Sequence, residues 1–176
     1  MTMLTNIFLI GPMGVGKTTI GHLLGKALYM TFIDSDQEIE KRAGVSIPLI
    51  FEHEGEAGFR QRERAAIADL TTHHDVILST GGGVVLDINN RKHLQNRGYV
   101  IYLHASVDEL LERTAQNNNR PLLQTENPRE RLETILNERH PLYTAVADAT
   151  IETGQRNIRQ VLKAIITHLQ CEFFIE

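Results

Sequence analysis

A glycine-rich stretch near the N-terminus carries the clearest chemical signal in the chain. Residues 11–18 read GPMGVGKT and fit the phosphate-loop pattern G-x-x-x-x-G-K-[ST]. The glycines let the backbone fold into a cradle of inward-pointing N–H groups, and a following helix adds the partial positive charge of its N-terminus. Lys17 supplies an ammonium group for the β- and γ-phosphates, and Thr18 supplies a hydroxyl for Mg²⁺. The stretch predicts a nucleoside triphosphate site.

Acidic residues and further glycines follow two other predicted strands. Many phosphate-loop proteins hold Mg²⁺ with an aspartate at the end of a core strand, but the run VILST (76–80) leads into the triple glycine 81–83 instead. We expect Asp34 to take the metal role through water, because Mg²⁺ keeps several waters, and Asp36 to face a different ligand. Alternatively, both acids only complement a helix dipole, and the glycines form a plain turn.

Three arginine positions could serve an anionic ligand. Arg60 lies in a charge run of the kind that usually forms a solvated helix face, where Glu63 could hold it by an i,i+3 pair. Arg139 either closes a helix end before Pro141 or reaches a ligand, and Arg113 has the least distinctive surroundings. Arginines that converged on one pocket would suit a carboxylated substrate, because guanidinium pairs bidentately with carboxylate.

The elements that must position these groups alternate between strand and helix. Helical spacing of apolar residues covers 17–29 and the last helix, which begins at Ile158. Short apolar runs predict strands at 6–10, 30–33, 76–80, 99–103 and 149–153. This order predicts an α/β fold of three layers, with a five-stranded parallel sheet and helices on both faces. In such sheets ligands bind at the carboxyl ends of the strands, where the loop, the acids and the glycines all lie.

Local signals mark helix starts and one long connection. Capping-box spacing at Ser35/Glu38 and at Ser106/Glu109 predicts two helix N-termini. Residues 115–127 lie between two predicted helices, and a connection of this length is more often functional or mobile than idle.

Bulk composition restricts the class of protein. The 176 residues fit one domain, and the net charge of −4 gives no broad basic field for nucleic acid. The single Cys171 cannot form an internal disulfide, which favours a reducing compartment. No segment has the length of a membrane span or the form of a signal peptide, so we expect a cytoplasmic protein. We expect a monomer, because the composition offers no obvious large apolar interface.

Phosphate loops serve several classes of protein. The short chain argues against motor and transport ATPases, and the absence of the guanine signature N-K-x-D argues against a GTP switch. A small kinase for a metabolite or a nucleotide remains.

Six stretches, in order along the chain, resemble the shikimate kinase family. They are GPMGVGKT (11–18), DSD (34–36), GFRQRE (58–63), GGG (81–83), NRPLL (119–123) and ERHPLY (138–143). Only the first is decisive alone, but the ordered set is specific and covers nearly the whole chain. The tail CEFFIE (171–176) and the detail of the 115–127 segment do not match. We expect Phe173 and Phe174 of this tail to pack against the domain.

The resemblance implies a single phosphate-loop kinase domain over 1–176, with ATP and shikimate as its small-molecule partners. Such a kinase transfers the γ-phosphate of ATP to the 3-hydroxyl of shikimate, giving shikimate 3-phosphate and ADP, in chorismate and aromatic amino-acid biosynthesis. Residues 35–63 would form the substrate-binding region and 115–127 a lid. Pro121 disfavours helical backbone at Arg120, so this arginine would arrive extended and touch the transferring phosphoryl group.

The resemblance also implies roles for individual residues. Asp36 would orient or deprotonate the attacking hydroxyl and Arg60 and Arg139 would clamp the carboxylate. Catalytic roles would fall on Lys17, Asp36 and Arg120. Substrate would be held by Asp36, Arg60, Gly81, Gly82, Gly83 and Arg139. Nucleotide contacts would come from Gly14, Val15, Gly16, Lys17, Thr18, Thr19, Arg113, Arg120 and Arg156, and Mg²⁺ contacts from Thr18 and Asp34.

Two other interpretations stay open. A kinase for another small hydroxy acid, such as gluconate, would keep the phosphate loop but need not keep Asp36, Arg60 and Arg139 together. A non-catalytic nucleotide-binding or regulatory protein would also keep the loop, although the presence of Lys17, Asp34, Asp36 and Arg120 speaks against it.

Overall fold

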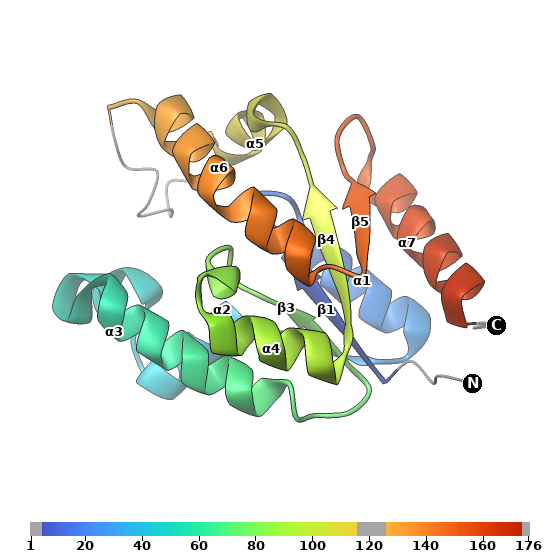
Figure 1. The fold of residues 1–176 in the computed structure, drawn as a ribbon, viewed down its shortest axis with the longest axis horizontal. Coiled ribbons are helices and arrows are strands. Elements are labelled where there is room, and N and C mark those ends of the chain that lie inside the picture. The colour runs from blue at the N-terminus through green and yellow to red at the C-terminus, as the bar shows by residue number, and fades with distance from the viewer. Residues whose placement is uncertain (1–4, 116–125, 174–176) are drawn as a thin grey trace.

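A computed structural model describes residues 5–115 and 126–173. The described chain folds into a five-stranded parallel sheet in the order β2-β3-β1-β4-β5, with helices between the strands (Figure 1). The strands are β1 (Asn6–Ile10), β2 (Thr31–Asp34), β3 (Val76–Ser79), β4 (Tyr99–His104) and β5 (Ala149–Glu152). The helices are α1 (Lys17–Leu28), α2 (Ser35–Ala43), α3 (Ile47–Leu70), the 3-10 helix η1 (Val84–Leu86), α4 (Ile88–Arg97), α5 (Val107–Thr114), α6 (Pro128–Val146) and α7 (Ile158–Phe173). The predicted α/β class and the parallel sheet are confirmed.

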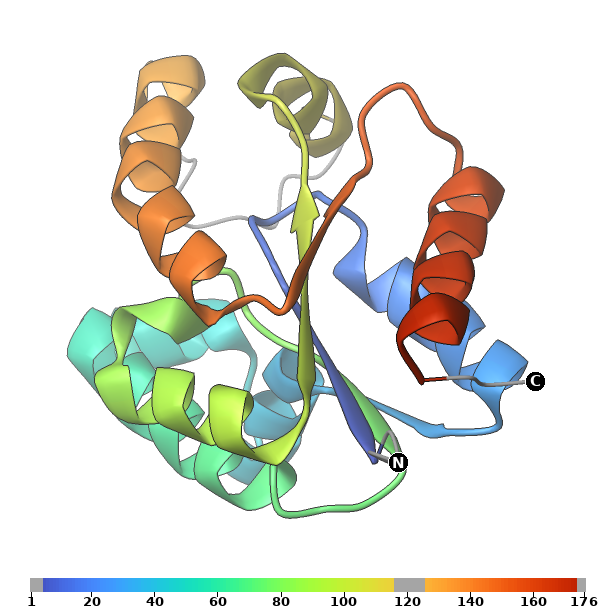
Figure 2. The same cartoon turned by 45° about the vertical axis from the view of Figure 1, so that its right-hand side comes forward.

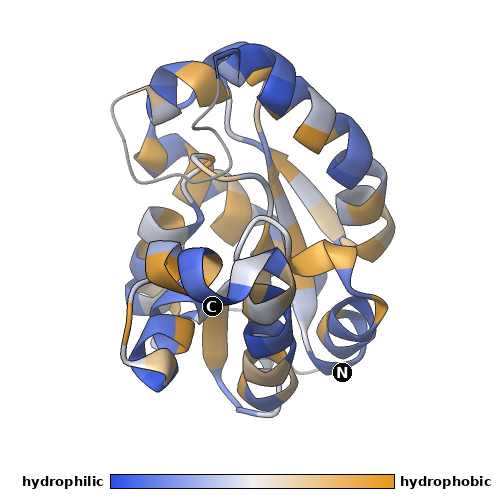
Figure 3. Ribbon diagram, turned by 90° about the vertical axis from the view of Figure 1, so that its left-hand side faces the viewer, coloured by the Kyte–Doolittle hydropathy of each residue, from blue (hydrophilic) through white to orange (hydrophobic). Residues whose placement is uncertain are grey.

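The helices cover the sheet on both faces and produce three layers. Figure 2 shows the sheet nearly edge on, with α1 and α7 on one side and α3, α4 and α6 on the other. Alternate residues of β1 enter different cores: Ile7 and Leu9 pack toward α1 and α7, whereas Phe8 and Ile10 pack toward α3 and α4. Because both faces are buried, the interior strands carry continuous apolar runs rather than an alternating pattern. Figure 3 shows this hydrophobic interior, with hydrophilic residues on the helices around it.

The two predicted capping boxes have different outcomes. Ser106 and Glu109 form the complete reciprocal box at the start of α5, as predicted. At Ser35 and Glu38 the predicted helix start is confirmed, since α2 begins at Ser35, but the N-cap is Asp34, whose side chain accepts from two backbone N–H groups. A carboxylate one residue earlier satisfies the same donors, so the hydroxyl of Ser35 is left for another contact.

Helices α3 and α6 each contain a residue that disfavours helical structure. Gly55 interrupts α3 with φ 69° and ψ −176°, so the helix bends there and a second segment carries Arg60. Helix α6 continues through Pro141 to Val146, so Arg139 does not close a helix end. No helix in the described ranges 5–115 and 126–173 is long and apolar enough to cross a membrane.

Candidate active site

The phosphate loop joins β1 to α1, as predicted. Gly11, Gly14 and Gly16 have φ values of 144°, 81° and 102°, which side chains with a Cβ rarely adopt. Lys17 begins the helix, is buried, and donates from Nζ to Gly11 O at 2.6 Å and to Pro12 O at 2.8 Å. The loop therefore places a buried ammonium group at a helix N-terminus, where phosphate groups bind favourably.

Two oxygen-bearing side chains meet beside this loop. Thr18 Oγ1 donates to Asp34 Oδ2 at 2.8 Å, which joins α1 to the end of β2. The other oxygen of Asp34 accepts from Asp36 N at 2.9 Å and Gln37 N at 3.2 Å. A cavity of about 190 Å³ lies here, lined by both side chains together with Lys17. A hydroxyl and an oriented carboxylate are the oxygen ligands that suit Mg²⁺, so these residues fit that ion.

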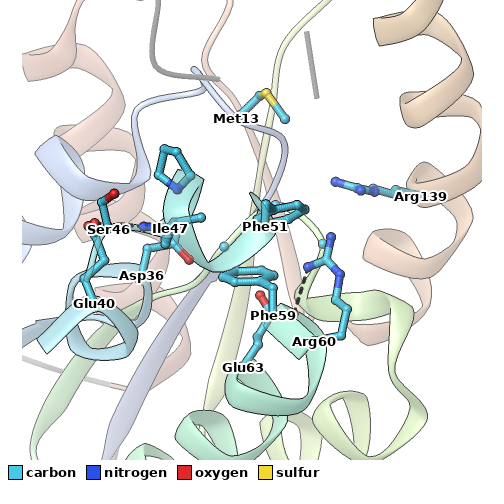
Figure 4. A pocket seen from close by; sticks show the side chains of 14 residues that line it. Met13, Asp36, Glu40, Ser46, Ile47, Phe51, Phe59, Arg60, Glu63 and Arg139 are labelled. Carbon is cyan, nitrogen blue, oxygen red and sulfur yellow. Dashed lines mark hydrogen bonds and ion pairs between the residues drawn. The ribbon is translucent and has the colours of Figure 1, made fainter. Parts of the chain in front are cut away.

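A second pocket opens beside the first at the carboxyl ends of β2 and β3. Its volume is about 320 Å³, and Figure 4 shows side chains from α2, α3 and α6 that surround it. It brings together all the residues predicted to bind substrate, which are Asp36, Arg60, Gly81, Gly82, Gly83 and Arg139. The convergence that spacing alone could not show is therefore present in the fold.

The two arginines of this pocket come from different helices. Figure 4 shows Arg60 extending from α3 and Arg139 from α6 toward the same space. The side chain of Arg60 is 17% exposed, and Arg139 is only 4% exposed. The Nε atoms of both arginines are buried without a hydrogen-bond partner among the described residues. Two guanidinium groups with buried, unused Nε donors have the chemistry that suits an anion, and a carboxylate in particular.

Glu63 is the buried counter-charge of Arg60. Arg60 Nη1 donates to Glu63 Oε1 at 2.9 Å, and Nη2 donates to the more exposed Glu56 at 3.2 Å. Burial opposes the charge on Arg60, but the two neighbouring carboxylates outweigh it and raise the pKa of the guanidinium. Burial raises the pKa of Glu63 despite the nearby Arg60. The predicted i,i+3 pair is confirmed, but it lies in the pocket wall and not on a solvated surface.

Two residues of the triple glycine lie directly against charged side chains of the pocket. A Cβ atom at Gly81 would lie 2.8 Å from Asp36 Oδ1, and one at Gly83 would lie 2.3 Å from Arg60 Nη2. The turn therefore passes against the acid and the cation of the pocket, and neither position has room for a side chain as the site stands.

A third, more open cavity of about 740 Å³ lies on the other side of the phosphate loop. It is lined by loop residues together with Arg113 and Arg156. Arg113 donates to Val15 O at 3.3 Å and to Thr153 Oγ1 at 3.2 Å, so it joins the loop to the segment after β5. The arrangement places both predicted nucleotide arginines beside Gly14, Val15, Gly16 and Thr19.

Several residues of the pocket were missed by sequence reasoning. Phe51 and Phe59 form an aromatic wall with ring centroids 4.9 Å apart, and Arg60 lies 5.2 Å from the Phe59 ring centroid. Ile47 and Pro48 extend the apolar side. Their one sequence signal is helical spacing, which is the same for an ordinary core helix.

Two sequence predictions fall partly or wholly outside the described residues. Arg120 and residues 116–125 of the predicted lid are not described, so the lid stays a prediction. Phe173 packs edge-on against Tyr99 with ring centroids 4.9 Å apart, as expected, and Phe174 lies outside the described residues.

Comparison with known proteins gives one consistent family. A family model described as shikimate kinase matches residues 13–170. A curated shikimate kinase of Methylococcus capsulatus is 60% identical over 161 residues, which is 92% of this chain and 90% of the relative. A solved structure of a shikimate kinase from Acinetobacter baumannii, in complex with shikimate, has a TM-score of 0.93 and 47% identity, covering 96% of this chain and 94% of the other.

The fold extends to a kinase of a different hydroxy acid. A gluconokinase structure from Sinorhizobium meliloti has a TM-score of 0.61 at 16% identity, covering 96% of this chain and 93% of the other. A likeness at this identity shows a shared fold alone.

Proposed function

The chain belongs to the shikimate kinase family, and from this premise we propose how its residues carry out the reaction. The activity is transfer of the γ-phosphoryl group of ATP to the 3-hydroxyl of shikimate, which gives shikimate 3-phosphate and ADP in the biosynthesis of chorismate and the aromatic amino acids. Phosphoryl transfer passes through a loose transition state, so the protein contributes mainly by positioning the reactants and stabilising charge.

The observation that carries the assignment of roles is the overlap of two cavities. The cavity at the phosphate loop and the pocket with the two arginines share four lining residues, Met13, Asp36, Gly81 and Gly82. A phosphate donor in the first cavity and a carboxylated acceptor in the second would therefore meet beside Asp36. The reacting groups come together at the shared wall, which is what in-line transfer needs.

The acceptor is held by its carboxylate at one end and its hydroxyls at the other. Arg60 and Arg139 bind the carboxylate from two different helices, because each has a buried Nε donor without a partner among the described residues. Phe51 and Phe59 cover an apolar face of the ring. Asp36 then accepts a hydrogen bond from the attacking ring hydroxyl. This contact orients the hydroxyl oxygen toward the phosphate loop. Residues 35–63 form the substrate-binding region of a single kinase domain.

The donor end is held by the loop and the first turn of α1. Lys17 releases the carbonyl groups of Gly11 and Pro12 and pairs with the β- and γ-phosphates, whose charge grows in the transition state. Arg113 and Arg156 border the cavity for the base. Thr18 and Asp34 would hold Mg²⁺, which would neutralise phosphate charge when bound.

A direct assay tests this function against its alternatives. ADP formation, coupled to a spectrophotometric readout, is measured with shikimate, with gluconate and with no acceptor. We expect turnover with shikimate that disappears in Lys17→Ala and persists in Lys26→Ala, an exposed lysine on the same helix. Turnover with gluconate alone would instead assign the gluconate reaction. ATP binding without transfer to any acid would assign a non-catalytic role.

The remaining parts of the proposal concern the setting of the enzyme. We place it in the cytoplasm as a monomer, with no nucleic-acid or membrane partner, as the composition suggests. Sedimentation of the purified protein across concentrations tests the monomer directly.

A further inference from the structure

Two hydroxyl groups hold the backbone of the triple-glycine turn from outside the substrate pocket. Gly81 N–H donates to Ser35 Oγ at 3.2 Å, and the hydroxyl of Tyr143 donates to the carbonyl oxygen of Gly82. Ser35 and Tyr143 are both fully buried, and neither lines the pocket. Ser35 begins α2 and Tyr143 lies near the end of α6, so the turn is fastened between two walls.

These contacts fix the orientation of successive peptide planes. A peptide unit is planar, and in its trans form the C=O and N–H groups point in opposite directions. Tyr143 fixes the Gly82–Gly83 unit through its carbonyl, and Val84 N fixes the Gly81–Gly82 unit by donating to Gly81 O at 3.2 Å. The N–H groups of Gly82 and Gly83 therefore point away from these contacts. Within the described part of the chain, neither N–H donates a hydrogen bond.

The two glycines with unused N–H groups lie beside the cations of the pocket. A Cβ built on Gly83 falls 2.3 Å from Arg60 Nη2, and one built on Gly82 falls 3.5 Å from Arg139 Nη1. An anionic group bound by Arg60 and Arg139 thus lies within reach of the turn. Glycine has the greatest backbone freedom of any residue, so an unfastened turn would lose more entropy when a ligand ordered it.

We propose that Ser35 and Tyr143 are positioning residues for the acceptor: together they hold the 81–83 turn so that its N–H groups meet the carboxylate end of shikimate. The inference rests on the proposed function, and it assigns roles to two residues that do not touch the substrate. Ser35 also sets the distance between the glycine turn and Asp36, its neighbour in the chain, since Gly81 packs directly against that carboxylate.

The surroundings of Tyr143 suit a permanent donor. Burial raises the pKa of Tyr143 to about 12, so the hydroxyl keeps its proton throughout the working range of the enzyme. Its ring stacks on Tyr102 with centroids 4.9 Å apart and planes inclined by 29°, which fixes the direction of the hydroxyl.

Paired tyrosine variants test the proposal. Tyr143→Phe removes the hydroxyl on the turn, whereas Tyr102→Phe removes the hydroxyl of the stacked neighbour, which contacts His140 at 3.0 Å and not the turn. We expect Tyr143→Phe and Ser35→Ala each to weaken shikimate binding about threefold to tenfold, measured by calorimetry without nucleotide. ATP affinity should stay within about twofold, because the loop contacts are untouched. Tyr102→Phe should leave both affinities unchanged.

Thermal melting and turnover separate the possible results. Both tyrosine variants lose a buried hydroxyl, and the Tyr143 hydroxyl also contacts the Arg139 side chain, so Tyr143→Phe should lower the melting temperature at least as much as Tyr102→Phe. Unchanged shikimate affinity in Tyr143→Phe and Ser35→Ala would overturn the inference, as would an equal loss of shikimate and ATP binding, which indicates general damage. A wild-type protein without shikimate-dependent ADP formation would instead overturn the proposed function itself.

Discussion

Arg60 Nη1 lies 2.9 Å from Glu63 Oε1, one turn further along α3, and this contact joins a pocket cation to a buried anion. The Glu63 side chain is 1% exposed, whereas that of Arg60 is 17% exposed and reaches the pocket. The buried carboxylate therefore anchors the guanidinium from behind while Nε stays without a partner among the described residues. An arginine held in one orientation loses less rotamer entropy when it binds a ligand.

Arg60→Ala should weaken shikimate binding about 100-fold, because loss of a charge-assisted pair to a carboxylate costs roughly 2–3 kcal/mol. ATP affinity should change little, since Arg60 does not line the phosphate cavity. Calorimetry with each ligand alone measures both values. Arg62→Ala is the matched control, because Arg62 lies two residues away and pairs at the surface with Glu54. Equal shikimate affinities in the two variants would contradict the carboxylate role.

Glu63→Gln should change how stability depends on pH. Burial raises the folded-state pKa of Glu63 above the ordinary value of 4.5, so the folded protein holds this proton more tightly than the unfolded chain does. As pH rises from the unfolded to the folded pKa, wild-type stability should therefore fall relative to Glu63→Gln, which cannot titrate. Denaturant unfolding of both proteins between about pH 4 and pH 8 measures the difference. A difference that grew more favourable to the wild type with rising pH would show a lowered pKa instead.

Asp34→Asn should raise the Mg²⁺ concentration needed for half-maximal turnover and leave the fold intact. Asparagine caps a helix about as well as aspartate, so α2 keeps its N-cap while the carboxylate beside Thr18 is lost. Asp87 caps α4 by the same pattern of two backbone N–H contacts, which makes Asp87→Asn the matched control. Activity titrated with Mg²⁺ should separate the two variants even if their melting temperatures agree. Identical titrations would remove Asp34 from the metal site.

Local sequence signals predicted most of the fold, but they did not identify which of two adjacent residues caps a helix. The apolar runs located all five strands of the described sheet, because strands buried on both faces are continuous in sequence. The helix start at Ser35 was predicted correctly but its cap was not, because Asp34 offers a carboxylate to the same helix end. Of the two roles left open for Arg139, closing a helix end before Pro141 is excluded, because α6 continues through Pro141 to Val146.

The site was predictable in its residue types but not in its geometry. The phosphate loop follows from spacing because all its groups are adjacent in the chain. Arg60 and Arg139 lie on different helices, α3 and α6, so only the tertiary fold brings them together. The roles of Ser35 and Tyr143 were invisible for a similar reason, because each acts through a backbone group far away in sequence.

Gly83→Ala should weaken shikimate binding only by displacing Arg60. The backbone at Gly83 has φ −95° and ψ 8°, which alanine tolerates, so the fold should be kept. The new Cβ would lie 2.3–2.5 Å from the guanidinium of Arg60, whose flexible end must move away. We expect shikimate affinity to fall about tenfold, with ATP affinity retained, because the carboxylate clamp is displaced.

A double-mutant cycle tests that mechanism. If the methyl group acts by moving Arg60, then Gly83→Ala should cost about tenfold in the wild-type background but less than about twofold in the Arg60→Ala background, where no guanidinium remains to be displaced. Shikimate affinity is measured by calorimetry for the four proteins of the cycle, and melting temperatures confirm that each is folded. Equal losses of shikimate affinity in the two backgrounds would mean that shikimate itself packs against Gly83 and that the alanine methyl group occupies the space it needs. The cycle therefore separates a glycine that accommodates the arginine from one that directly accommodates the substrate.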